Sequence, residues 1–166
     1  AYNNKTIKLI HGLDKENPIM LTSIFIKLCA KYNLDITDNP IHSKIAKELV
    51  MRAEKWRHPG QFHGPIARAS ATSSFLSSIL RSNCRDKYII DLYRSGIIKL
   101  LSPQLSYGID SNPNRIKYIH ERLFSANSKE SVFAALLEVV NKDQRKMFIK
   151  SFNMLTLRSW DIQDKK

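Results

Sequence analysis

Residues 18–32 read PIMLTSIFIKLCAKY, and this stretch decides the fold class. Its apolar side chains recur at intervals of three and four, at Leu21, Ile24, Phe25, Leu28 and Tyr32. Such spacing places them along one face of a helix, and the pattern stops near Asn33. The stretch therefore predicts an amphipathic helix whose apolar face belongs to a core.

This stretch begins at one of three Asn-Pro pairs in the chain. The pairs are Asn17-Pro18, Asn39-Pro40 and Asn112-Pro113. Asparagine is a good N-cap, and proline suits the first helical position, where its missing N–H costs nothing. Each pair therefore predicts a helix start. The helix after Pro40 should end before Pro59-Gly60, because proline cannot continue it.

Helical spacing recurs over most of the remaining chain. It is found over residues 66–80, 86–94, 113–123, 128–140 and 143–157, with a short turn over 97–101. Ser102 to Ser111 contains Pro103 and Gly108, so we expect a connecting loop there. No repeat period is visible, which disfavours a solenoid. We expect a compact all-α, single-domain bundle of about seven helices over residues 1–166, with flexible ends at 1–16 and 161–166.

Charge gives the first indication of function. The chain carries 27 Lys and Arg against 15 Asp and Glu, a formal net charge of +12. Self-repulsion of this size is best tolerated when an anionic partner neutralises it. Residues 55–107 are the most unbalanced third, with two acids in the whole segment. We therefore expect a polyanionic partner, with RNA first, although the charge also serves solubility.

Two sets of basic residues are candidates for phosphate contacts. The first lies in the segment that lacks acids and comprises Lys55, Arg57, His58, His63, Arg68, Arg81 and Arg85. The same segment is rich in serine and threonine hydroxyls, which often contact phosphate. The second set shares a helix face near the end of the chain and comprises Lys142, Arg145, Lys146 and Lys150. Its alternative interpretation is a solvated helix face.

Aromatic, histidine and cysteine residues add little to this picture. Exposed rings could stack on bases, but we expect Trp56 and Tyr118 in the core. His58 and His63 lack further ligands for zinc, so no metal site and no cofactor are expected. The two cysteines are too few for a disulfide framework, and no signal peptide or membrane span is visible. These features predict a soluble protein of a reducing compartment, cytoplasmic or nuclear.

One short segment carries a catalytic possibility. In Asn114-Arg115-Ile116-Lys117-Tyr118-Ile119-His120, an arginine is followed five positions later by a histidine. The segment resembles the Arg-x4-His motif of HEPN-superfamily ribonucleases. The resemblance implies an all-helical bundle in which His120 acts as acid or base on an RNA 2′-hydroxyl and Arg115 stabilises the phosphate. The alternative is structural: Arg115 pairs with Asp110, and a carbonyl satisfies His120.

The sequence thus favours binding over catalysis and leaves three functions open. The leading one is an RNA-binding domain that grips backbone phosphates with weak sequence preference. The second is a protein-interaction domain, such as a viral or bacterial factor that docks on an acidic partner surface. The third is the ribonuclease that uses Arg115 and His120. Phosphoinositides remain an alternative anionic ligand because a basic patch does not distinguish one phosphate from another.

Overall fold

The computed structural model describes residues 18–55 and 65–152, and for residues 65–70 the backbone alone. Within these ranges the chain forms ten α-helices, one short 3-10 helix and no strand. The helices are α2 (Pro18–Tyr32), α3 (Pro40–Lys55), α4 (Pro65–Arg81), α5 (Arg85–Arg94), α6 (Ile97–Leu101), α7 (Pro103–Ser111), α8 (Arg115–Tyr118), α9 (His120–Ser125), α10 (Lys129–Leu137), η1 (Lys142–Gln144) and α11 (Arg145–Ser151). The predicted all-α class is confirmed.

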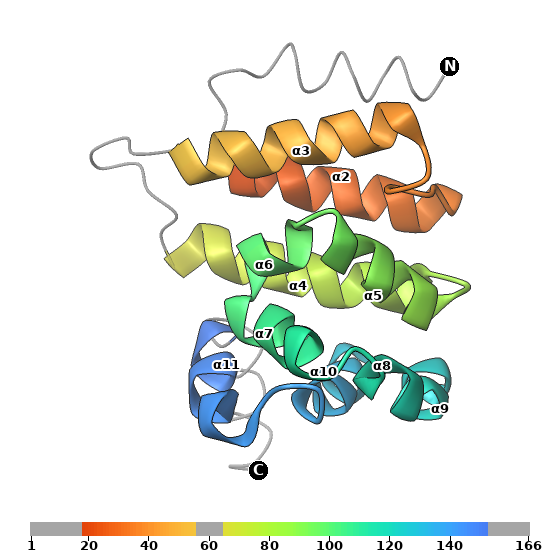
Figure 1. Ribbon diagram of the computed structural model, residues 1–166, viewed down its shortest axis with the longest axis vertical. Helices are drawn as coiled ribbons and strands as arrows, with labels where there is room; N and C mark the ends of the chain where they lie inside the picture. The colour runs from red at the N-terminus through yellow and green to blue at the C-terminus, as the bar shows by residue number, and fades with distance from the viewer. Residues whose placement is uncertain (1–17, 56–64, 153–166) are drawn as a thin grey trace.

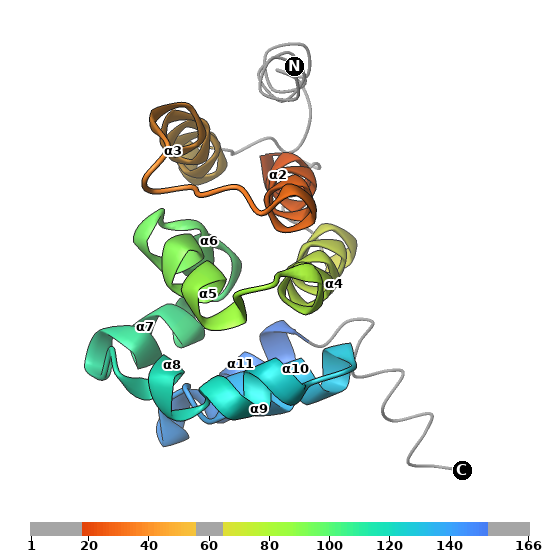
Figure 2. The ribbon, with the colours of Figure 1, turned by 90° about the vertical axis from the view of Figure 1, so that its right-hand side faces the viewer.

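The helices are stacked in three tiers (Figures 1 and 2). The upper tier holds α2 and α3, the middle tier α4, α5 and α6, and the lower tier α7 to α11. The most extensive packing is between α2 and α4, which joins the upper and middle tiers. α4 also packs on α10, and α6 on α7, so the middle tier holds the other two together.

α2 is buried over a wider arc than one apolar stripe. Ile26 and Cys29 are in the core, whereas Ile24 and Tyr32 of the predicted stripe are exposed. The reason is that α2 packs against both α3 and α4, so two sides of the helix face other elements. The hydroxyls that this burial encloses are satisfied within the helix, as when Thr22 donates to the Pro18 carbonyl at 2.8 Å.

The Asn-Pro pairs mark helix starts with different precision. Before α3, the Asn39 side-chain oxygen accepts hydrogen bonds from the backbone N–H groups of Ile41 at 3.0 Å and His42 at 3.2 Å. Asn112 uses its side-chain oxygen for the N–H of Asn114 at 3.1 Å, and α8 begins only at Arg115. The third pair therefore forms a turn, and the helix starts two residues after its proline.

The expected loop at Ser102 to Ser111 is wrong, because α7 occupies it. Ser102 is the N-cap, its hydroxyl accepting from the Leu105 N–H at 3.3 Å, and Pro103 takes the first helical position. Gly108 lies inside the helix because α7 passes close to the backbone of Val139. The glycine reflects a close approach of two backbones and not a turn.

The expected number of helices was also too small. The segment predicted as one helix after Pro113 is broken at Ile119 into α8 and α9. α10 ends at Leu137, and the last predicted helix consists of η1 followed by α11 up to Ser151. The continuation of that helix to residue 157 lies beyond the described residues. Short helices result because the lower tier changes direction several times as it wraps under α4 and α5 (Figure 2).

A cluster of phenylalanines holds α11 against the core. Phe133 of α10 stacks on Phe148 of α11, with ring centroids 5.2 Å apart. Phe152 packs on Phe148 at 4.6 Å and reaches Phe75 of α4 at 6.2 Å. All four are almost fully buried. Aromatic contacts at these separations add stability beyond the burial of apolar area, so they anchor α11 to the middle tier.

Candidate nucleic-acid interface

The first predicted basic set is only partly described. Arg57, His58 and His63 lie outside the described ranges, and Arg68 is placed on α4 by its backbone alone. Lys55 is the last residue of α3, and Arg81 the last of α4; both are exposed. In Figure 1, α3 ends and α4 begins at the left, whereas α4 ends at the right. A helix of 17 residues spans about 25 Å, so these two cations belong to opposite ends of the molecule.

Arg85 is bonded inside the protein. Its guanidinium donates to the carbonyls of Leu123, Phe124 and Ala126, at the end of α9, and to that of Leu80 on α4. The side chain thereby joins three helices. These bonds occupy donors that a phosphate would need, so the geometry supports a structural role for Arg85.

The hydroxyl-rich segment of α4 also faces inward. Thr72, Ser74 and Ser78 are buried, and the Ser78 hydroxyl donates to the Phe75 carbonyl at 2.7 Å, with its oxygen 3.0 Å from the hydroxyl oxygen of Tyr88. Small polar residues allow α4 to pack closely against α2 and α10. They do not offer a row of hydroxyls to a ligand.

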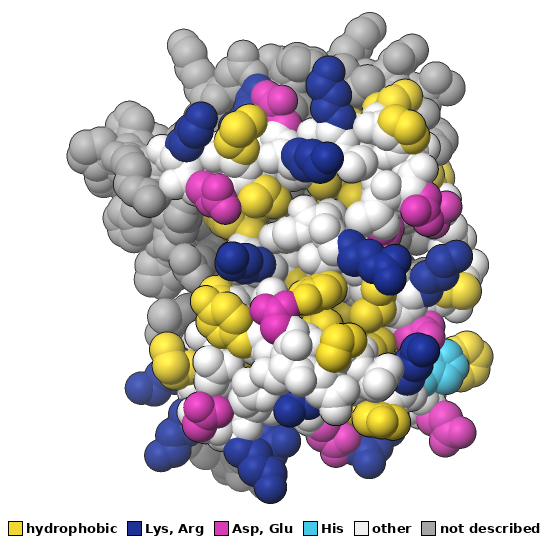
Figure 3. Space-filling view, viewed as in Figure 1, with side chains coloured by type: hydrophobic (Ala, Val, Ile, Leu, Met, Phe, Trp, Pro, Cys, Tyr) yellow, Lys and Arg dark blue, Asp and Glu magenta, His cyan; other side chains and the backbone are white. Residues whose placement is uncertain are grey.

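The second basic set is the more fully described and exposed of the two predicted sets. Lys142, Lys146 and Lys150 are exposed and form no ion pair with a described carboxylate, and we call them the lysine ridge. Arg145 beside them is half-buried and reaches the Val140 carbonyl at 3.4 Å. Figure 3 shows dark-blue side chains gathered at the lower left, over η1 and α11. Elsewhere on that face, cations are scattered among acids and apolar side chains.

Arg115 and His120 are bonded to different neighbours. Arg115 donates to the carbonyl of Val139 at 2.7 Å, to that of Gly108 at 3.2 Å and to the Asn141 side chain at 2.6 Å. His120 pairs through Nδ1 with Asp86 of α5 at 3.2 Å. The expected partners, Asp110 and a carbonyl, were therefore wrong. Nothing in the described chain directs the two side chains at a common phosphate.

Two large aromatic rings are exposed on α8 and α9. Tyr118 is 75% exposed, so its expected place in the core is wrong, and Phe124 is 67% exposed. The Phe124 ring lies 6.3 Å from that of His120. Trp56 lies outside the described ranges. Large exposed rings of this kind can act as apolar anchors for a partner.

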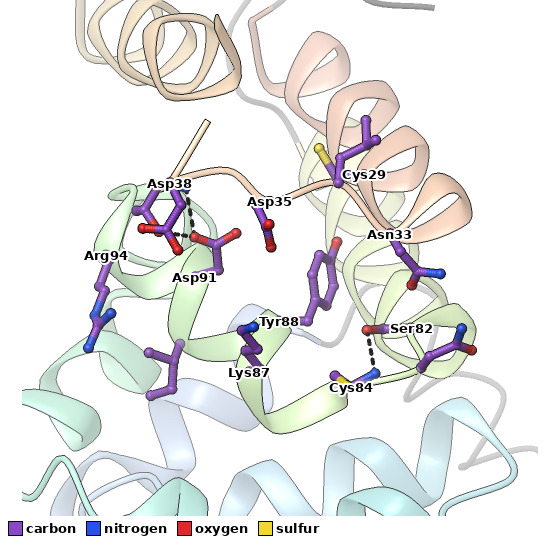
Figure 4. Close-up of a pocket in the computed structure, with 14 residues that line it drawn as sticks. Cys29, Asn33, Asp35, Asp38, Ser82, Cys84, Lys87, Tyr88, Asp91 and Arg94 are labelled. Atoms are coloured by element: carbon purple, nitrogen blue, oxygen red, sulfur yellow. Dashed lines mark hydrogen bonds between the residues drawn. The ribbon is translucent and has the colours of Figure 1, made fainter. Parts of the chain in front are cut away.

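One pocket in the described chain was not predicted from the sequence. It has a volume of about 260 Å³ and opens between the end of α2, the loop that follows it, the loop before α5 and α5 itself. Figure 4 shows its side chains, with Asp35 directed into the open space and Tyr88, Lys87 and Asp91 around it. Because its residues come from 29–38 and 82–94, only tertiary packing assembles it.

The loop that carries Asp35 is held by Asp91. One Asp91 oxygen accepts from the Ile36 N–H at 2.6 Å, and the other accepts from the N–H of Thr37 at 2.8 Å and from its hydroxyl. The Asp35 carbonyl is hydrogen-bonded to the buried ring of His42 at 2.8 Å. Before Asp35, the Leu34 N–H donates to the Cys29 carbonyl at 2.9 Å. The backbone is therefore fixed on both sides of Asp35.

The pocket is lined both by buried neutral groups and by charged side chains. Burial raises the pKa of the Cys29 thiol and of the Tyr88 hydroxyl, so both remain protonated. The Tyr88 hydroxyl donates to the Ile26 carbonyl at 2.9 Å. Asp35, Asp38, Lys87 and Arg94 also line the pocket, and none of them has a hydrogen-bond or ion-pair partner through its side chain in the part of the chain that the structure describes. Free donors and acceptors therefore face one cavity.

Other kinds of site find no support in the described part of the chain. Over residues 18–55 and 65–152, no group of three His, Cys, Asp or Glu side chains is arranged to hold a metal ion. No helix there is long and apolar enough to cross a membrane. Comparison with known proteins found no matching protein family, no matching curated protein and no matching solved structure.

Proposed function

We propose that this protein binds RNA through contacts to its phosphates. The observation that carries the proposal is the lack of internal neutralisation of its cations. Among the described Lys and Arg side chains, only Arg52 and Arg122 pair with a carboxylate. Uncompensated cations on a chain of net charge +12 favour association with a polyanion, because binding releases the counterions of the phosphates.

Two groups of free cations are the proposed contacts. One is the lysine ridge on η1 and α11. The other consists of Lys87 and Arg94, which line the pocket, and the exposed Arg81, which directly precedes the lining residue Ser82; we call them the pocket cations. The lysine ridge lies at the lower left of Figure 1, whereas the pocket cations lie on and beside α5, toward the right of the middle tier. An RNA strand several nucleotides long would be needed to reach both groups.

The test is a fluorescence-anisotropy titration of labelled single-stranded RNA over a series of salt concentrations. Replacing all three residues of the lysine ridge by glutamine should weaken binding and reduce the slope of log K against log salt by about 2, since each phosphate contact on a single strand contributes about 0.7. Replacing the three pocket cations by glutamine should have an effect of the same size.

The matched control is the triple variant Lys27→Gln, Lys44→Gln and Lys47→Gln. It removes the same charge from exposed positions on α2 and α3 that neither line the pocket nor belong to the lysine ridge. It should retain most of the salt slope. Equal losses in all three variants would contradict defined contact sites, and no binding at low salt would contradict RNA binding itself.

A second function is favoured by the exposed rings of Tyr118 and Phe124. An acidic protein could dock there, with the rings as apolar anchors and Lys117 and Arg122 beside them. The same titration separates the two functions. RNA binding predicts loss of affinity in the cation variants, whereas protein docking is the remaining function if no RNA binds at low salt.

A further inference from the structure

We infer that the pocket beside α5 holds a guanine base of a single-stranded RNA, with the Asp35 carboxylate as the group that recognises it. This inference rests on the proposed RNA binding and adds a base preference to it. It is carried by the size of the cavity, by the free carboxylate directed into it and by the free cations at its edge.

The cavity suits a single base. Its volume of about 260 Å³ lies just below the range of roughly 300–1,000 Å³ found for pockets that hold drug-sized ligands. Leu34, Ile90 and the buried Tyr88 contribute apolar surface, against which a planar ring can pack. A flat heterocycle therefore fits where a larger ligand would not.

The Asp35 carboxylate offers acceptors without donors. Two acceptor oxygens on one group match a ligand with two adjacent N–H donors. Among the four RNA bases, guanine alone presents such a pair, N1–H and the 2-amino group, on its Watson–Crick edge. Uracil places its single N–H between two carbonyls, which would repel the carboxylate. The loop bonds to Asp91 and His42 hold Asp35 in place before any ligand arrives.

The surrounding charges fit a base that belongs to a nucleic-acid strand. Lys87 and Arg94 line the pocket together with the carboxylates of Asp35, Asp38 and Asp91, and Lys87 forms no ion pair with Asp35. Arg81 directly precedes the lining residue Ser82. These cations can bind the phosphates on either side of the base. In a duplex, the Watson–Crick edge is already paired, so the pocket would accept guanine only from an unpaired segment.

The experiment compares three labelled oligonucleotides of ten nucleotides. One is all uridine, one carries a single central guanosine, and one carries inosine at that position, which lacks the 2-amino group. The wild-type protein should bind the guanosine oligonucleotide about tenfold more tightly than the uridine one, with inosine between them, as expected for a bidentate base contact. The Asp35→Asn variant should bind all three with affinities within about twofold.

The control is Glu54→Gln, which makes the same change in net charge at an exposed position on α3. Both variants should bind oligouridine slightly more tightly than the wild type, but only Glu54→Gln should keep the preference for guanosine. Equal binding of all three oligonucleotides by the wild type would overturn the guanine pocket and leave RNA binding intact. A preference that persists in Asp35→Asn would overturn the role of Asp35. No binding of any oligonucleotide would overturn RNA binding and the pocket together.

Discussion

Gly108 is required by a close approach of two backbones, whereas Gly96 is required by a positive φ. A Cβ atom on Gly108 would lie 2.2 Å from the carbonyl oxygen of Val139, which is backbone and cannot rotate away. Gly108→Ala should therefore force α7 away from residues 139–140 and lower the free energy of unfolding by about 2–3 kcal/mol, despite the better helix propensity of alanine. Urea denaturation followed by circular dichroism measures this loss.

Gly96 provides the matched control at the residue scale. Its φ is +85°, but the nearest side-chain atom to an added Cβ is a Val50 methyl at 3.8 Å. Asparagine tolerates this left-handed region, so Gly96→Asn should cost less than about 1 kcal/mol. Gly108→Asn should cost at least as much as Gly108→Ala. A Gly108→Ala variant as stable as the wild type would contradict the close approach of the two backbones.

The role of an individual arginine could not be predicted from the sequence. Arg81 and Arg85 look equivalent in a segment with few acids, yet Arg81 is exposed and Arg85 bonds carbonyls about 40 positions further along the chain. Arg115 likewise bonds the Val139 carbonyl. These partners are backbone groups, which are the same in every residue and leave no pattern in the sequence. Only the path of the chain decides which cations remain free.

At the scale of elements, α7 depends on its cap. Ser102 is fully buried, and its hydroxyl satisfies the Leu105 N–H at the start of the helix. Ser102→Ala leaves that N–H without its partner, so the free energy of unfolding should fall by about 1 kcal/mol. The measurement is the midpoint of urea denaturation at an unchanged slope.

Ser125→Ala is the control for the cap. Ser125 is exposed at the end of α9, and its hydroxyl bonds back to the Glu121 carbonyl of the same helix at 2.9 Å. Its removal should change stability by less than about 0.5 kcal/mol. A similar loss in both variants would mean that the Ser102 hydroxyl does not act as a cap.

The helix boundaries that could be predicted from the sequence are those set by residues a few positions apart in the chain. Asn39-Pro40 caps α3 as expected, because both partners lie within three residues. Ser102-Pro103 carries the same kind of signal, but Pro103 and Gly108 were interpreted as breakers, and the loop prediction was wrong. Proline at the first position of a helix and glycine at a close approach of two backbones are residue types that also occur in turns, so the sequence alone does not distinguish the two cases. Their meaning depends on Val139, 31 residues from Gly108.

At the scale of the whole molecule, composition and periodicity sufficed for the all-α class but not for the pocket. The predicted surface over residues 55–85 divides between two ends of α4, because a helix of 17 residues separates its members. The pocket joins residues 29–38 to residues 82–94. No spacing in the sequence connects these segments, since α3 and α4 intervene between them. The site follows from how the tiers pack, and periodicity describes each helix alone.

The packing of the tiers also predicts how stability depends on pH. Cys29 is buried, and burial raises its pKa from the usual value of 9.0, so the thiol ionises in the unfolded chain at a lower pH than in the folded protein. A group with a raised folded pKa stabilises fully below its unfolded pKa, and this stabilisation is lost as pH rises above it. Between pH 8 and pH 10, the wild type should therefore lose about 1.4 kcal/mol more than Cys29→Ala.

Cys84, the second cysteine of the chain, serves as the control. Its thiol is exposed to water in the folded protein, so Cys84→Ala should leave the loss of stability between pH 8 and pH 10 unchanged. Cys29→Ala should be less stable than the wild type at pH 7, because it leaves a small cavity, yet its stability should vary less with pH. Tyr88 strengthens the trend only above its usual pKa of 10.0, since burial raises that pKa too. Equal pH dependence in the wild type and Cys29→Ala would mean that the Cys29 thiol is hydrated, and its burial beside the pocket would then be wrong.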